Sequence, residues 1–374
     1  MRVLQIGKYF PPYQGGVEIV TEMSARALAG VHEVTVVCHN TDRNTRREIF
    51  ADYSVVRCGT QVTVMKQPIS LSMGWEIRNA RPELIHLHAP NFWAAAMILL
   101  FAPTTPIIIT HHCDVEGRWL ARKALMPLYQ QIVRRARSII VASKKTASWS
   151  TDLLANLVTI AEIPLGLDER KFEVTATERV AIAQQKRARY GNQTLFGFVG
   201  RLVWYKGLPT LLRAMTKVDG MRLVVVGDGP MKADLVALAK ELGVSDRVEF
   251  LGHIDDAEKK YWMYAIDALV LPSTHKTEAF GLVQVEAQLC GKAVVTTDLP
   301  TGVSDITIDG VTGKIVRAGD IDHLADALQH LVDNPALLQR FGAAGRLRAM
   351  QNYTERRYME RLRAEVASVV ATVG

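Results

Sequence analysis

Short runs of β-branched residues alternate with longer stretches of helical spacing along this chain. A first series of such runs ends near residue 142, and a second series starts at residue 196. Alternation of this kind builds parallel sheets that carry helices on both faces. We therefore expect an α/β fold made of two Rossmann-like, doubly wound domains. The expected strands are residues 3–6, 34–37, 62–65, 84–87, 107–110 and 139–142 in the first domain, and 196–199, 222–226, 248–251, 268–271 and 293–296 in the second.

The domain boundary is expected after the segment that ends at Asp168. A length of 374 residues suits two domains that each bury a core of their own. The segment 174–191 that follows is polar and charged, and a last helix is expected over 355–370. We therefore divide the chain into residues 1–168, residues 169–354 and a C-terminal helical segment, 355–374.

Composition is that of an ordinary globular protein, with 48% apolar and 22% charged residues. The four cysteines are scattered without zinc-like spacing, which indicates reduced thiols. Signal-peptide architecture is absent, and the longest apolar stretch, 92–102, is too short to span a bilayer. No basic–aromatic interleaving typical of nucleic-acid binding accompanies the charge. These features predict a cytoplasmic protein that does not bind nucleic acid.

The net charge of +7 includes a cluster of basic residues in one stretch of helical spacing. Arg118, Arg122 and Lys123 lie there among apolar residues. A basic amphipathic face can bind an anionic membrane surface, and these three residues are our candidates for an acceptor- or membrane-facing side. The alternative is an ordinary solvated helix face.

The segment from Glu278 to Glu286 sets two carboxylates eight residues apart around a Phe–Gly turn. It follows the expected strand 268–271 and leads into a helix. A helix N-terminus offers free N–H groups and a positive dipole end, which bind phosphate well. The two carboxylates could then flank a bound phosphate and accept hydrogen bonds from sugar hydroxyls. Two solvated glutamates on a surface helix are the alternative.

Two candidate loops follow expected strands of the first domain. Gly15 and Gly16 come just before a helix, where adjacent glycines let the backbone approach a phosphate closely. This pair is not the G-x-G-x-x-G fingerprint, which counts against a dehydrogenase. His111 and His112 end the strand 107–110, where a histidine can bind a polar ligand. His86 and His88 share one face of a strand, but no third metal ligand is evident, so we expect no metal.

Three candidate loops follow expected strands of the second domain. Arg201 and Lys206 stand five residues apart after Gly200, and two cations at a strand end could neutralise a pyrophosphate. Gly227 starts a tight turn into a helix. Gly252 and His253 end a third strand, where backbone groups could meet a flat base. Each of these loops has a purely structural alternative.

Taken in order, these motifs resemble those of the retaining glycosyltransferases of family 4. The resemblance covers both halves of the chain. It implies the GT-B fold, in which two Rossmann-like domains face each other across a cleft and the last helix crosses back to the N-terminal domain. It also implies that the C-terminal domain binds a sugar nucleotide and the N-terminal domain an acceptor. The sequence departs from the common pattern at Thr301, where many relatives carry glycine.

The resemblance also implies roles for single residues. Arg201 and Lys206 would hold the diphosphate, Glu278 the sugar hydroxyls and Glu286 the ribose. His112 matches the family histidine near the transferred sugar better than His111, which stays an alternative. The remaining donor contacts would come from Gly15, Gly16, Gly200, Gly227, Gly252, His253, Phe280, Gly281 and Leu282.

The activity implied is retaining transfer of a hexose from a nucleotide-diphosphate sugar. GDP-mannose is favoured as the donor, with UDP-hexoses next, and no metal or cofactor is expected. The acceptor would be a glycan or polyprenyl-linked hydroxyl in cell-surface polysaccharide synthesis, at the inner face of the cytoplasmic membrane. The alternatives are an epimerase or phosphorylase of the same fold, and a non-catalytic subunit that binds sugar nucleotides.

Overall fold

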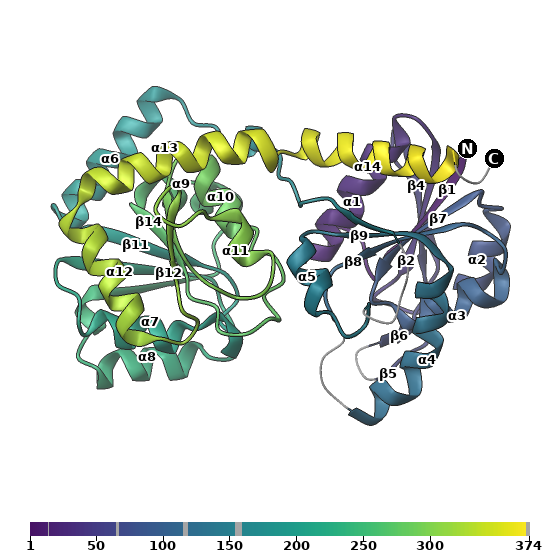
Figure 1. Cartoon of the computed structure of the whole chain (residues 1–374), viewed down its shortest axis with the longest axis horizontal. Helices are drawn as coiled ribbons and strands as arrows, with labels where there is room; N and C mark the ends of the chain where they lie inside the picture. The colour runs from purple at the N-terminus through teal and green to yellow at the C-terminus, as the bar shows by residue number, and fades with distance from the viewer. Residues whose placement is uncertain (14, 65–66, 115–118, 154–158, 372–374) are drawn as a thin grey trace. The chain divides into compact units, whose positions relative to one another are not determined.

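A computed structural model describes all of the chain except residues 14, 65–66, 115–118, 154–158 and 372–374. The side chains of residues 119–124 also lie outside the description. The chain folds into two compact units (Figure 1), one of residues 1–165 with 355–374 and one of residues 166–354. The first boundary thus falls between Leu165 and Gly166, whereas the sequence analysis placed it after Asp168.

The N-terminal unit contains an eight-stranded sheet in the order β10-β9-β8-β7-β1-β2-β4-β3. Its neighbouring strands are parallel, except for the antiparallel pair β3–β4. The strands are β1 (Arg2–Ile6), β2 (Glu33–His39), β3 (Arg46–Ile49), β4 (Tyr53–Cys58), β7 (Leu84–Ala89), β8 (Ile107–His111), β9 (Ala136–Val141) and β10 (Ile160–Glu162). The helices are α1 (Gly16–Ala29), α2 (Met73–Asn79), α3 (Phe92–Phe101), α4 (Trp119–Arg135), α5 (Lys144–Trp149) and α14 (Glu355–Ala371).

The C-terminal unit contains a six-stranded, wholly parallel sheet in the order β13-β12-β11-β14-β15-β16. Its strands are β11 (Thr194–Val199), β12 (Met221–Val226), β13 (Val248–Gly252), β14 (Ala268–Leu271), β15 (Ala293–Thr297) and β16 (Gly313–Val316). Its helices are α6 (Ala176–Tyr190), α7 (Leu208–Met215), α8 (Lys232–Glu241), α9 (Asp256–Ala265), α10 (Val283–Leu289), α11 (Val303–Ile306), α12 (Ile321–Asp333) and α13 (Pro335–Asn352).

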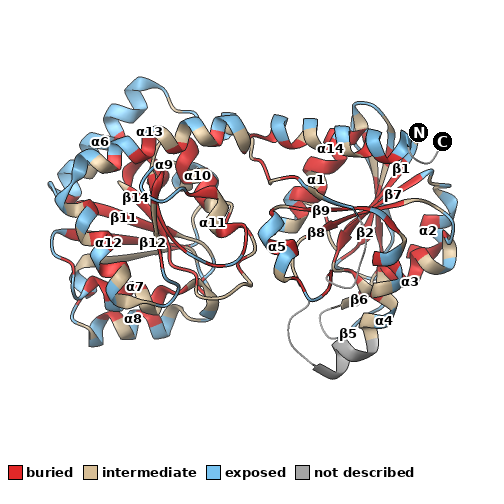
Figure 2. Ribbon diagram, in the orientation of Figure 1, coloured by how far each residue is buried: buried red, intermediate tan, exposed pale blue. Residues whose placement is uncertain are grey.

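Both sheets are buried at their centres, as Figure 2 shows by colour. Every residue of β7, β8 and β14 is buried, because strands covered on both faces expose neither set of alternating side chains. This accounts for the continuous apolar runs in the sequence. Strand order reverses beside β1 in one sheet and beside β11 in the other. Ligands of doubly wound sheets bind beyond the carboxyl ends of strands at such points.

The prediction of an α/β fold with two doubly wound domains is confirmed, but one expected strand was wrong and one helix was not predicted. Residues 62–64 form β5 (Val62–Val64), which is exposed and pairs antiparallel with β6 (Gln67–Ile69) outside the main sheet. The polar segment 174–191 is largely the helix α6, which begins with a capping box between Thr175 and Glu178. A helix with only two buried residues lacks the apolar periodicity that sequence reasoning uses.

The last helix, α14, belongs to the N-terminal unit. It packs against α1, where Tyr358 is fully buried and its hydroxyl lies 2.7 Å from Ser24 Oγ. Arg26 of α1 forms an ion pair with Glu355, and Arg363 donates to the carbonyl of Ala27 at 2.6 Å. Among the described helices, none is both long and apolar enough to cross a bilayer.

Candidate functional site

A buried ion pair lies beyond the ends of β11 and β14. Lys206 Nζ is 2.5 Å from Glu278 Oε2, and the two side chains are only 12% and 10% exposed. The hydroxyl of Ser273 donates to the same carboxylate oxygen at 3.2 Å. Lys206 ends a 3₁₀ turn, Trp204–Lys206, and Glu278 precedes α10. The fold therefore joins two residues that are 72 positions apart in the sequence (278 − 206).

The loops that carry this pair pass very close to each other. Gly207 has φ of 73°, and a Cβ atom there would lie 1.9 Å from the carbonyl oxygen of Pro272. Only glycine tolerates both the left-handed conformation and this approach. Thr301 donates its hydroxyl to the backbone oxygen of Glu278 at 2.8 Å. The residue that departs from the family pattern thus helps to hold the Glu278 loop.

The ends of β11, β12 and β13 are joined through glycines. The N–H of Gly200 donates to Val226 at 3.0 Å, and that of Gly227 donates to Gly252 at 2.7 Å. A Cβ atom on Gly227 would lie 2.0 Å from the carbonyl oxygen of Gly200. These three glycines therefore pack the strand ends together. His253 follows Gly252 and is exposed.

Arg201 follows directly after Gly200, and its side chain is exposed. Among the described residues, no carboxylate pairs with its guanidinium. Lys206 instead has its charge balanced by Glu278. Within the described part of the chain, the loop after β11 therefore carries Arg201 as an unpaired cation and Lys206 as a paired one.

Glu286 lies on α10 and pairs with Lys259 of α9, with Nζ 3.2 Å from Oε1. Burial raises the pKa of Glu286, and the charge of Lys259 opposes that shift. Phe280 is buried, with its ring edge-to-face against Tyr353 at 6.2 Å between centroids. Gly281 and Leu282 follow it immediately before α10. Sequence reasoning missed Lys259, because only the packing of the unit brings it to Glu286.

The histidines of the N-terminal unit form a connected group. His111 is buried, with Nε2 3.1 Å from Asp114 Oδ1 and Nδ1 3.4 Å from the Tyr129 hydroxyl. His112 is only partly buried, and its Nε2 lies 3.1 Å from Nδ1 of His88. Burial lowers the pKa of His112 to about 3, with smaller contributions from His111 and His86, so its ring is neutral. Of the two adjacent histidines, His112 is the one that a ligand can reach.

A metal site is not formed by this group. Within the part of the chain that the structure describes, no three His, Cys, Asp or Glu side chains converge on a common position that could hold a metal ion. His86 makes its hydrogen bond to Thr110 Oγ1 at 2.7 Å instead.

Gly15 and Gly16 lie at the start of α1. Gly16 has open space where a Cβ would stand, whereas a Cβ on Gly15 would meet the carboxylate of Glu18. Burial raises the pKa of Glu18, and a hydrogen bond from its own N–H opposes that shift. Because this carboxylate already lies at the helix N-terminus, a phosphate bound there requires Glu18 to move aside or to be protonated.

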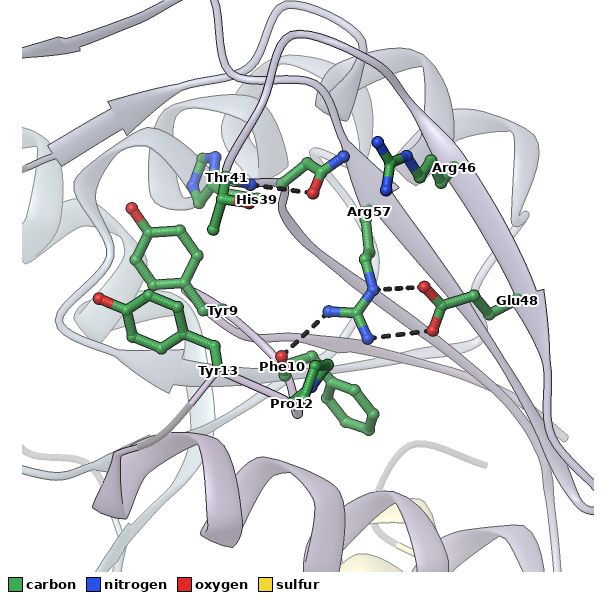
Figure 3. Close-up of a pocket in the computed structure, with 10 residues that line it drawn as sticks. Tyr9, Phe10, Pro12, Tyr13, His39, Thr41, Arg46, Glu48 and Arg57 are labelled. Atoms are coloured by element: carbon green, nitrogen blue, oxygen red, sulfur yellow. Dashed lines mark hydrogen bonds and ion pairs between the residues drawn. The ribbon is translucent and has the colours of Figure 1, made fainter.

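A pocket of about 450 Å³ opens beside the first loop (Figure 3), and the sequence analysis missed it. The rings of Tyr9 and Tyr13 stack on one side of it, with centroids 4.3 Å apart. On the other side Arg57 is held by Glu48 at 2.6 Å and donates to the carbonyl of Phe10 at 3.0 Å. The pocket thus combines an aromatic platform with charges that are already paired, which suits a neutral polar ligand such as a sugar ring.

The three basic candidates on the acceptor side lie outside the description. Arg118 is among the residues that the structure does not describe, and the side chains of Arg122 and Lys123 are also excluded.

Comparison with known families accounts for both units. Residues 14–171 match the family described as Glycosyltransferase Family 4. Residues 180–348 match the one described as Glycosyl transferases group 1. The chain is a glycosyltransferase whose N-terminal unit matches family 4. It is therefore an enzyme that transfers a sugar from a sugar-nucleotide donor to a glycan acceptor.

Named relatives extend over nearly the whole chain. D-rhamnosyltransferase WbpZ of Pseudomonas aeruginosa is 28% identical, over 95% of this chain and 92% of the relative. O-antigen chain mannosyltransferase C of Escherichia coli is 26% identical, over 95% of each chain. The GDP-mannose-dependent alpha-(1-6)-phosphatidylinositol monomannoside mannosyltransferase of Mycolicibacterium smegmatis is 26% identical, over 98% of each chain.

Solved structures agree on the fold. The Anabaena HepE structure in complex with UDP has a TM-score of 0.79 at 20% identity, covering 98% of this chain and 100% of that one. The predicted GT-B architecture of two Rossmann-like units is thereby confirmed.

Proposed function

We propose that this enzyme transfers mannose from GDP-mannose to a lipid-linked or glycan hydroxyl in cell-surface polysaccharide synthesis, with retention of the anomeric configuration and without a metal ion. The observation that carries this proposal is the Lys206–Glu278 pair, together with the exposed Arg201 in the same loop, which pairs with no carboxylate among the described residues. These groups lie at the switch point of the C-terminal sheet, where a doubly wound sheet binds its ligand.

The charges explain how a diphosphate would leave. Negative charge develops on the diphosphate as its bond to the sugar breaks, and fixed cations stabilise that charge. Arg201 and Lys206 supply two such cations, and no protein base is needed if the leaving diphosphate takes the proton of the acceptor hydroxyl. Glu278 neutralises Lys206 before the donor binds, and then accepts hydrogen bonds from hydroxyls of the donor sugar.

The other contacts are assigned to residues at the ends of strands and at helix starts. Glu286 accepts hydrogen bonds from the ribose hydroxyls, and Gly252 with His253 meets the base. Phe280, Gly281 and Leu282 contribute backbone contacts to the sugar and phosphate. Gly15, Gly16 and His112 are the contribution of the N-terminal unit, with His112 directed at the transferred sugar.

The donor proposal is supported by the named relatives, two of which are mannosyltransferases, one of them GDP-mannose-dependent. It is tested by a thermal-shift panel of GDP- and UDP-sugars, followed by assays of nucleotide release with each donor that binds. We expect GDP-mannose to give the largest rise in Tm and the fastest release. A UDP-hexose that exceeds it in both measurements would overturn the choice of donor.

Retention and metal independence are tested on the same reaction. The anomeric configuration of the product is measured by proton NMR and compared with that of the donor. We expect the same configuration in both, and we expect the rate to survive exhaustive chelation. An inverted product, or activity that returns only when a divalent cation is added, would contradict the corresponding part of the proposal.

We assign acceptor binding to the pocket of Tyr9 and Tyr13, because stacked aromatic rings offer an apolar face to a sugar ring. Replacing Tyr13 by alanine is expected to raise the KM for the acceptor by about tenfold, the scale of one lost aromatic contact, and to leave the donor KM unchanged. An increase in the donor KM without an increase in the acceptor KM would contradict the assignment of this pocket to the acceptor.

Membrane association is the last part of the proposal, and it rests on Arg118, Arg122 and Lys123. The protein should float with anionic phospholipid vesicles at low salt and dissociate as salt rises, because the Debye length shortens. Reversal of the three charges should abolish flotation and leave binding of the nucleotide sugar intact. Equal binding of the wild type and the variant would remove these residues from that role.

A further inference from the structure

A line of hydrogen-bonded side chains crosses the middle of the N-terminal sheet from α1 to His112. Gln5 Nε2 lies 2.5 Å from the backbone oxygen of Thr21 and 2.9 Å from His88 Nε2. His88 Nδ1 lies 3.1 Å from His112 Nε2, and these two rings stack at 5.3 Å between centroids. Gln5 and His88 are fully buried on the neighbouring strands β1 and β7.

The direction of every bond in this line is fixed at its Thr21 end. A backbone carbonyl only accepts, so the Gln5 atom that faces Thr21 must be the amide nitrogen. The reverse orientation of the amide would set two carbonyl oxygens against each other at 2.5 Å. The second hydrogen of the same amide then points to His88 Nε2, which must accept it.

The protonation of both histidines follows from that start. A neutral imidazole has one donor and one acceptor nitrogen, so His88 carries its proton on Nδ1. That proton is donated to Nε2 of His112, so His112 carries its own proton on Nδ1. Among the described residues Nδ1 of His112 has no hydrogen-bond partner, and it is not a buried atom, so it faces solvent.

We propose that Gln5 and His88 are positioning residues that hold His112 in the neutral tautomer with its proton on Nδ1. In this state His112 donates a hydrogen bond to an oxygen of the donor sugar and cannot take a proton from the acceptor. The statement about the sugar rests on the proposed function, but the tautomer follows from the fold alone. A histidine ring without hydrogen-bond partners can carry its proton on either nitrogen. The hydrogen bonds from Gln5 through His88, which we call the relay, therefore select the Nδ1 tautomer of His112.

The surroundings of the two rings agree with this assignment. Burial lowers the pKa of His88 and of His112, so both stay neutral at ordinary pH. The nearest carboxylate in sequence, Asp114, is engaged by His111 and by Ser150 instead. Among the described residues, no carboxylate hydrogen-bonds His88 or His112, so nothing there favours a charged ring.

The tautomer can be observed directly in the full-length protein. Protein labelled with ¹⁵N at histidine gives long-range proton–nitrogen correlations that show which ring nitrogen carries the proton. The His112 signals are identified by their loss in the His112→Asn variant. We expect a neutral ring with its proton on Nδ1 throughout pH 6 to 8. A proton on Nε2, or a ring that becomes charged in this range, would overturn the proposal.

Two substitutions of His88 form a matched pair. In His88→Asn the short amide places its nitrogen near the former Nδ1, so it can still donate to His112. In His88→Gln the longer amide reaches toward Gln5 and leaves His112 without that donor. We expect the Nδ1 proton of His112 to persist in the first variant and to be shared between both nitrogens in the second. Identical spectra from the two variants would overturn the proposal.

Kinetics of the same pair separate positioning from general structural damage. We expect kcat of His88→Gln to fall by about tenfold, the scale of one misdirected hydrogen bond, with the donor KM within about twofold of wild type. His88→Asn should recover most of this loss. If both variants lose the same activity while the circular dichroism spectrum and Tm stay normal, His88 has no such role.

Two further variants keep the test independent of folding and of activity. Gln5→Met removes the first donor and should also mix the two tautomers of His112, whereas His86→Gln lies next to this line of hydrogen bonds and should leave the His112 proton on Nδ1. If His112 keeps its proton on Nδ1 in the Gln5→Met variant, Gln5 does not fix the tautomer and the proposal is contradicted. If the relay is observed but no sugar is transferred, the proposed function fails and the tautomer assignment stands.

Discussion

The two units keep their functional polar groups in different states of charge. In the C-terminal unit, Lys206 and Lys259 are charged and paired with Glu278 and Glu286. In the N-terminal unit, burial keeps the rings of His88 and His112 neutral. A buried charge is tolerated only with a partner, whereas a neutral ring needs only hydrogen bonds. Under the proposed function, the C-terminal unit supplies the cations for the leaving diphosphate, and His112 of the N-terminal unit acts as a neutral donor.

The largest effect expected from this contrast is on Lys206. Lys206→Ala should lower the rate of sugar transfer by at least about a hundredfold, the scale of losing one oriented charge contact in the transition state. It also leaves the Glu278 carboxylate, only 10% exposed, without its cation. The rate of nucleotide release at saturating donor measures the effect, with Lys240→Ala on the exposed face of α8 as a control.

Glu278→Ala should cost a similar factor, and the double variant should cost much less than the product of the two, because the residues act as a pair. If the rate losses of the two single variants simply multiply in the double variant, Lys206 and Glu278 do not act as a pair. The contrast between the paired charges of the C-terminal unit and the neutral rings of the N-terminal unit would then fail. A Lys206→Ala enzyme with near-normal turnover would remove Lys206 from the diphosphate role.

The next effect is a difference in unfolding free energy between alanine substitutions at Gly207 and at Gly16, which lie in loops of different units. Gly207→Ala should lower the free energy of unfolding by about 2 kcal/mol or more, because the new methyl group would meet the carbonyl of Pro272 in a left-handed conformation. Gly16→Ala should change stability by less than about 0.5 kcal/mol, since nothing lies near its Cβ position. Urea titrations of both variants measure the difference.

Equal destabilisation by these two alanines would contradict the contrast between a tight loop after β11 and an open one before α1. If Gly16→Ala keeps its stability but loses donor affinity, the close approach of backbone to phosphate at Gly16 is supported.

A smaller effect is expected at Glu286. Glu286→Ala should weaken nucleotide binding by about tenfold, the value of one or two hydrogen bonds to a charged group, and leave kcat at saturating donor within about twofold. Calorimetric titration with the free nucleotide measures the affinity. The control is Glu258→Ala, an exposed carboxylate on α9. A loss in kcat without a loss in affinity would move Glu286 from the ribose to the reacting sugar.

The smallest expected effect is a stability gain that depends on pH. Because burial raises the pKa of Glu286, its contribution to folding is greatest below the ordinary glutamate pKa and is lost as pH rises through the raised value. Glu286→Gln removes the carboxylate whose ionisation causes this loss of stability. Lys259 still has a carboxylate partner in the variant, because its Nζ lies 3.8 Å from Asp256 Oδ1. The substrate-free variant should therefore melt about 2 °C above wild type at pH 8, with a smaller difference at pH 5.

Thermal melts across pH 5 to 8 decide the point. A Glu286→Gln protein that is less stable than wild type, by the same amount at every pH, would show that the carboxylate is stabilised by Lys259 rather than strained by burial. In that case the Lys206–Glu278 and Lys259–Glu286 pairs would both stabilise the C-terminal unit. We expect instead that the Lys259–Glu286 pair lowers stability and is kept for its function.

Sequence reasoning located most strands of both sheets because fully buried strands leave continuous apolar runs. The strand 268–271 was predicted to its exact bounds, and 222–226 to within one residue. It missed β3, β4 and β10 of the first sheet, β16 of the second, and the helix α6. Strand β16 is short and α6 is polar, so neither shows an apolar period. It placed 62–65 in the main sheet because an apolar run does not reveal which strand it pairs with.

The chemistry was visible only in part. Arg201, Lys206 and Glu278 stood out as charges that follow expected strands, and Glu286 as a second carboxylate eight residues after Glu278. Lys259, Glu18 and the pocket of Tyr9 and Tyr13 did not, because nothing in their spacing indicates what they face. The choice between His111 and His112 was open in the sequence, and burial of His111 against Asp114 and Tyr129 distinguishes them in the structure.

By itself the sequence determined the class of fold, the family and the residue types at the ends of the strands, because these depend on local periodicity and on short motifs. Only the tertiary structure decided which of those residues meet. It brought Lys206 to Glu278 and Lys259 to Glu286, and it aligned Gln5 of β1, His88 of β7 and His112, which directly follows β8. The physical reason is that charge balance and tautomer depend on contacts between distant segments, and those contacts exist only once the parallel sheets have formed.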